Sequence, residues 1–147
     1  MAHLERSVAT LRIMGDDLVP EEISRLLGAV PTSAHAKGHQ YPLEESGRLV
    51  TRKSGVWRLR AREAQPEDLD GQVSELLGLV TSNLSVWGDL TNRFRVDMFC
   101  GWFMGSANEG VQISSGTLLA LGQRRIMLSV DIYGPNASDV DHGETHV

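Results

Sequence analysis

Residues 94–103, FRVDMFCGWF, constrain the fold more than any other stretch, because they predict a strand with apolar side chains on both faces. Val96, Met98, Cys100 and Trp102 fall on one face, and Phe99 lies on the other. A strand that is apolar on both faces is usually central in its sheet. A glycine-containing loop, a short apolar helix at 114–123 and a last strand at 126–133 follow, so we expect the sheet to be built around this region.

The rest of the chain alternates helix-like and strand-like patterns. Residues 7–14 and 56–62 predict strands, and residues 33–37 a shorter one. Residues 19–28, 64–80 and 84–91 predict helices, and the polar stretch within residues 29–54 predicts a long surface excursion. These elements favour an α+β fold, a two-layer sandwich of a mainly antiparallel sheet with helices on one face. The first six elements follow the order of a ferredoxin-like split βαβ, so we expect a ferredoxin-like variant with a helix and a strand appended.

Length and composition indicate one soluble domain. The chain has 147 residues, and we expect an N-terminal extension over 1–6, a single domain over 7–134 and a disordered tail over 135–147. A net charge of -5 argues against nucleic acid as a partner, and no apolar run is long enough to cross a membrane. With a single cysteine and no signal-peptide pattern, the sequence favours a cytoplasmic protein of bacterial type.

The order of several short features carries a family resemblance. They are ATLRIMGDDLVPEEISRLLGAVPTSAHAKG, then GVWRLRA, then VDMFCGWFMGSANEGVQISSGTLLALGQRRIMLSVDIYG. Together they resemble the bacterial domain of unknown function (DUF) 4279 family over about residues 7–134. The resemblance implies no activity and no catalytic residues.

Two carboxylates on the predicted helix-free face are the first candidates for chemistry. Asp97 and Asp131 lie on two strands that are plausible neighbours, so they could serve as acid and base or bind a divalent cation. The alternative is that each carboxylate pairs with an arginine. The full set of candidate ligand-binding residues is Arg12, Trp57, Asp97, Trp102, Asn108, Asp131 and Tyr133.

Other residues suggest either an interaction face or a purely structural role in the core and turns. Arg58, Arg60 and Arg95, with Arg12 and Arg62, predict a basic stripe on the helix-free face that could meet an acidic partner. Cys100 is expected to be buried and inert among apolar neighbours. Asp16 and Asp17 fit a turn, and His35 and His39 lack a third ligand, so we expect no metal site and no cofactor.

These observations favour a non-enzymatic binding or protein-interaction domain, of which a toxin-neutralising, immunity-type protein is one form. The partner would be another protein or a second copy of the chain. No phosphate loop, dinucleotide fingerprint or nucleophile elbow is present, which lowers the expectation of an enzyme without removing it. The alternative is a small-molecule-binding or hydrolytic domain that uses Asp97 and Asp131.

Overall fold

A computed structural model describes residues 4–135 of the chain. The expected tail over 135–147 therefore lies outside the described residues apart from Pro135. In chain order the elements are β1 (Arg6–Gly15), α1 (Pro20–Leu27), β2 (Ser33–His35), β3 (Gln40–Pro42), β4 (Leu49–Thr51), β5 (Gly55–Arg60), α2 (Leu69–Leu79), α3 (Leu84–Arg93), β6 (Arg95–Phe103), α4 (Ser115–Gln123) and β7 (Met127–Tyr133).

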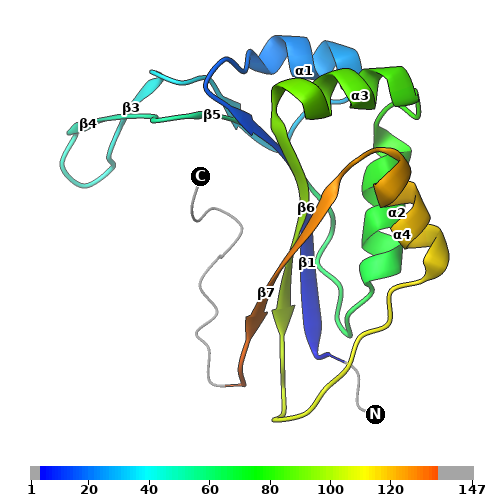
Figure 1. The fold of residues 1–147 in the computed structure, drawn as a ribbon. Helices are drawn as coiled ribbons and strands as arrows, with labels where there is room; N and C mark the ends of the chain where they lie inside the picture. The colour runs from blue at the N-terminus through cyan, green and yellow to red at the C-terminus, as the bar shows by residue number, and fades with distance from the viewer. Residues whose placement is uncertain (1–3, 136–147) are drawn as a thin grey trace.

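Five of the strands form one sheet in the order β2-β5-β1-β6-β7, and the four helices cover one of its faces (Figure 1). All neighbours are antiparallel except β6 and β7, which run parallel. β5 lies between β1 and β2, so β1, α1 and β2 form a split βαβ unit. The predicted α+β two-layer architecture is confirmed.

The core lies between the sheet and the helices, because alternate residues of the strands are apolar on that side. Leu11 and Ile13 of β1, Trp57 of β5 and Met98 of β6 are fully buried there. A buried polar contact also joins the layers: the Gln72 side chain of α2 accepts from Ser7 Oγ at 2.7 Å and donates to the Ser7 carbonyl at 3.0 Å. This pairing satisfies polar groups that would otherwise be costly to bury.

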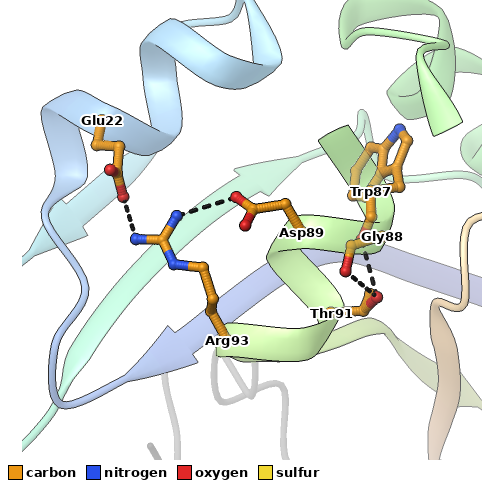
Figure 2. A network of polar contacts seen from close by, with 6 residues as sticks. All are labelled: Glu22, Trp87, Gly88, Asp89, Thr91 and Arg93. Atoms are coloured by element: carbon orange, nitrogen blue, oxygen red, sulfur yellow. Dashed lines mark hydrogen bonds and ion pairs between the residues drawn. The ribbon is translucent and has the colours of Figure 1, made fainter. Parts of the chain in front are cut away.

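Arg93, at the end of α3, forms ion pairs at the surface of the helix layer. Its guanidinium binds Glu22 of α1 at 2.6 Å and Asp89, one turn earlier in α3, at 3.0 Å (Figure 2). In the same helix the Thr91 hydroxyl donates to the Trp87 carbonyl at 2.8 Å. The Arg93–Glu22 contact ties α1 to α3 on the side of the sheet opposite the candidate site, and the other two contacts lie within α3.

Three local predictions differ from the structure. The predicted surface excursion contains a small two-stranded sheet, β3 with β4, which extends away from the main sheet (Figure 1). Alternation along residues 126–133 predicts that Ile132 faces the core, but it is 60% exposed, because β7 is an edge strand that extends past the helix layer (Figure 1). Arg62 lies beyond the end of β5 and contacts Glu75 instead of joining the basic stripe.

Candidate functional site

The helix-free face of the sheet is centred on an ion pair between β1 and β6. Arg12 binds Asp97 through both guanidinium edges, Nε to Oδ1 at 2.8 Å and Nη2 to Oδ2 at 2.6 Å. The two residues are directly opposite each other in the antiparallel ladder, and they are 7% and 0% exposed. The guanidinium also lies 4.3 Å from the ring centroid of Phe99. The arrangement is rigid, because a bidentate pair fixes the geometry of both side chains.

Further arginines line the same face beside this pair. Arg58 of β5 is opposite Arg12, and Arg60 is opposite Thr10. At the strand ends, the exposed Arg95 is opposite Met14. We call Arg12, Arg58, Arg60 and Arg95 the basic face. The register places Arg12 beside Arg58 on one adjacent strand and beside Asp97 on the other.

One histidine, His35, lies close to the basic face and has a lowered pKa. His35 of β2 is opposite Val56 of β5. Its pKa lies below the ordinary value because burial disfavours the imidazolium, and because Arg52 and Arg58 repel a further positive charge. Arg52 follows β4 and lies 4.1 Å above the Tyr41 ring, so the small β3–β4 sheet brings one more cation to this end of the face.

The two carboxylates proposed as an acid–base pair are not brought together. Asp131 of β7 is opposite Gly101 of β6, four residues along the strand from Asp97. At roughly 3.3 Å per residue the two carboxylates are about 13 Å apart along the strand. The Asp131 carboxylate instead accepts a hydrogen bond from the Tyr133 hydroxyl at 3.2 Å. Burial, and then the charge and hydrogen bond of Asp131, raise the pKa of Tyr133.

The remaining candidate ligand-binding residues lie elsewhere. Trp57 is buried on the helix side, where its indole N–H donates to Ser24 Oγ at 3.0 Å. Trp102 also lies on the helix side, packed against the core. Asn108 belongs to an exposed loop between β6 and α4. Of the seven candidates, the structure joins Arg12 to Asp97 and Asp131 to Tyr133, and it places the other three apart from both pairs.

Cys100 has the environment of a structural thiol. It is fully buried on the helix side of β6. Burial and the nearby Asp97 raise the pKa of the thiol to about 12. A thiol in that state is protonated at neutral pH and is a poor nucleophile.

Surface hollows formed by residues 4–135 also lie away from the basic face. A polar hollow of about 290 Å³ lies at one end of the sheet, beside the Arg6–Glu63 ion pair. A groove of about 560 Å³ lies between α2 and α4. In that groove Asp70 accepts hydrogen bonds from the Thr117 hydroxyl at 2.6 Å and the Ser114 backbone N–H at 3.1 Å. These bonds lower the pKa of Asp70 and hold the start of α4.

Sequence reasoning did not single out Thr10, Phe99 and Arg52 as parts of the site. Thr10 Oγ1 is buried and has no hydrogen-bond partner among the described residues. The signal for Thr10 and Phe99 was present in the strand alternation, which puts both on the face of Arg12 and Asp97. Arg52 could not be found in this way because it lies outside a predicted strand.

No three His, Cys, Asp or Glu side chains within residues 4–135 come together as the ligands of a metal ion would. None of the helices described is both long enough and apolar enough to cross a bilayer. Comparison with curated proteins and with solved structures found no match. The model of one family, Domain of unknown function (DUF4279), matches residues 5–135. This match covers most of the chain and confirms the resemblance in the sequence: the chain belongs to the DUF4279 family.

Proposed function

We propose that this chain is a non-enzymatic binding domain whose basic face takes an acidic segment of a partner protein. The observation that carries the proposal is the row formed by Arg58, Arg12 and Asp97 on three adjacent strands. Arg58 and Arg12 lie directly opposite each other on adjacent strands, and like charges in that position repel, so a carboxylate from a partner would be favoured beside them.

The charge balance of the molecule supports the same proposal. The chain carries a net charge of -5, yet four arginines gather on the basic face. After burial, Arg52 and Arg58 contribute to the lowered pKa of His35, so these cationic side chains are close to this end of the sheet. Complementary charge of this kind steers a partner and fixes its orientation.

The hydrolytic alternative has no comparable support. Asp97 is fully buried and already makes two hydrogen bonds to Arg12, and Asp131 is about 13 Å away along the strand. A shared acid–base step requires the two groups to reach one substrate, and this separation does not favour it.

The test uses a hexaglutamate peptide as the probe and a hexaglutamine peptide as the neutral control. Binding is followed by NMR chemical-shift changes at low ionic strength, where surface charges are least screened. We expect hexaglutamate alone to bind, and binding to weaken as salt is added. Arg95→Glu and Arg60→Glu should each abolish it.

The matched control is Arg25→Glu, because Arg25 is an exposed arginine of α1 on the helix side. This variant changes the net charge equally and should retain binding. Failure of the wild-type protein to bind hexaglutamate would refute the proposal. Equal loss in all three variants would show that only net charge matters, which also rules out a specific face.

A further inference from the structure

The outer edge of β7 carries backbone groups that no described residue pairs with. β7 is the last strand of the sheet, and its ladder joins it to β6 only. The Tyr133 carbonyl accepts from the Met104 N–H at 3.0 Å, so the Tyr133 backbone faces β6. Because backbone direction alternates along a strand, the N–H and C=O groups of Leu128, Val130 and Ile132 face outward. Such an edge is a template for another strand.

The side chains do not protect this edge. Proteins usually block a long edge strand with prolines, bulges or several charges. β7 has Asp131 as its one charged residue, and Met127 and Ile132 are 52% and 60% exposed. The opposite edge of the sheet, β2, has only three residues. The β7 edge is therefore the edge of this sheet that can most readily pair with a further strand.

From these features we infer that a second copy of this chain pairs with β7, antiparallel and with the twofold axis at Val130. This register brings Leu128 opposite Ile132 of the second copy, and Val130 opposite itself. All three outward-facing residues then lie in hydrogen-bonded pairs, and the two five-stranded sheets become one continuous sheet. The inference does not depend on the basic face and can fail separately from the proposed function.

The position of Asp131 favours this register over the two registers whose axis is shifted by one residue. With the axis at Val130, Asp131 lies opposite Ser129 of the second copy, and no like charges meet. Moving the axis to Asp131 would place the two Asp131 carboxylates directly opposite each other, which is unfavourable. Moving it to Ser129 would pair Asp131 with Met127 and leave the outward groups of Ile132 outside the ladder.

The adjacent helix α4 adds an apolar side chain beside this edge. Gly116 and Ala120 line the groove with α2, and Thr117 and Leu121 are buried toward the core. By helical periodicity Leu118 then lies on the side of α4 away from α2, and it is 52% exposed. Leu119 points away from the sheet and is 61% exposed. Leu118 would be covered in the paired form, and Leu119 would not.

Sedimentation equilibrium over a wide range of protein concentration tests the inference. The wild-type protein should form a dimer, and Ile132→Lys should weaken its association constant roughly tenfold, because the Ile132–Leu128 pair occurs twice per dimer. Leu119→Lys is the matched control: it adds the same charge at an equally exposed leucine and should leave the constant unchanged. Both sites are exposed, so both variants should keep the wild-type circular dichroism spectrum.

A second variant tests the register itself. Ser129→Lys places a lysine opposite Asp131 of the second copy and should tighten the dimer. A wild-type protein that stays monomeric at every concentration would overturn the inference, as would an Ile132→Lys variant that associates like the wild type. A weaker dimer in Ser129→Lys would exclude the axis at Val130, because lysines oppose each other only in the register centred on Ser129.

Discussion

The ion pair between Arg12 and Asp97 gives the sharpest test of the sheet's energetics. Replacing Arg12 with Met keeps an apolar stem of similar length but leaves the fully buried Asp97 without its two hydrogen bonds. Breaking a buried pair from one side costs about 3–5 kcal/mol, because the remaining charge is neither solvated nor paired. We expect a loss of that size in the free energy of unfolding at neutral pH.

The double variant Arg12→Met with Asp97→Leu should recover most of this stability. Removing both partners leaves no uncompensated charge, and such replacements are often close to neutral. The coupling energy of the double-mutant cycle should therefore be at least about 2 kcal/mol. Urea unfolding followed by tryptophan fluorescence measures it, because Trp57 and Trp87 are both fully buried.

The control variant is Arg93→Met, which breaks two contacts at the surface, to Glu22 at 2.6 Å and to Asp89 at 3.0 Å. Exposed pairs contribute little, so its cost should stay within about 1 kcal/mol. If Arg12→Met costs no more than Arg93→Met, or if the coupling energy is near zero, then burial does not govern the Arg12–Asp97 pair and the reasoning is refuted.

Three further predictions concern single groups. Cys100, with a pKa of about 12, should resist iodoacetamide at pH 8 in the folded protein and react after unfolding; prompt labelling of the native protein would contradict the burial argument. The lowered pKa of His35 means that the unfolded chain takes up a proton that the folded chain does not, so stability should fall as pH drops below 6.5. His35→Gln should flatten this slope in urea titrations, and an unchanged slope would assign it to other groups. Asp70→Ala should cost about 1 kcal/mol in urea unfolding, because the backbone N–H at the N-cap of α4 loses its acceptor; no loss would show that water replaces it.

The layers and most elements could be predicted from the sequence because strand alternation and helical periodicity are local signals. The run at 94–103 was correctly expected to be a central strand, and the order of elements predicted the α+β architecture. The strands Gln40–Pro42 and Leu49–Thr51 were missed because they are short and lie in a polar stretch with scattered Gly, Pro and Ser, which shows no clear alternation.

The site was harder to predict than the fold, because it depends on register between distant segments. Alternation put Arg12 and Asp97 on one face, but nothing local shows that they are directly opposite across 85 residues of chain. The same alternation could not show that Asp97 and Asp131 are offset by four positions along their strands. Trp57 was expected near a ligand, yet the pairing of its indole with Ser24 depends on how α1 packs.

The central position of β1 determines when the domain can be completed during synthesis. β1 is made first, but one of its two neighbours, β6, ends only at Phe103. Until then one whole edge of β1 has no partner, and the apolar side chains of Leu11 and Ile13 lack much of their cover. Native pairings between such distant segments form slowly because a long loop must close first. While only the N-terminal half has been made, the unpaired edge of β1 and its apolar side chains are exposed. Aggregation is therefore most favourable at that stage of synthesis, and a chaperone would help most then.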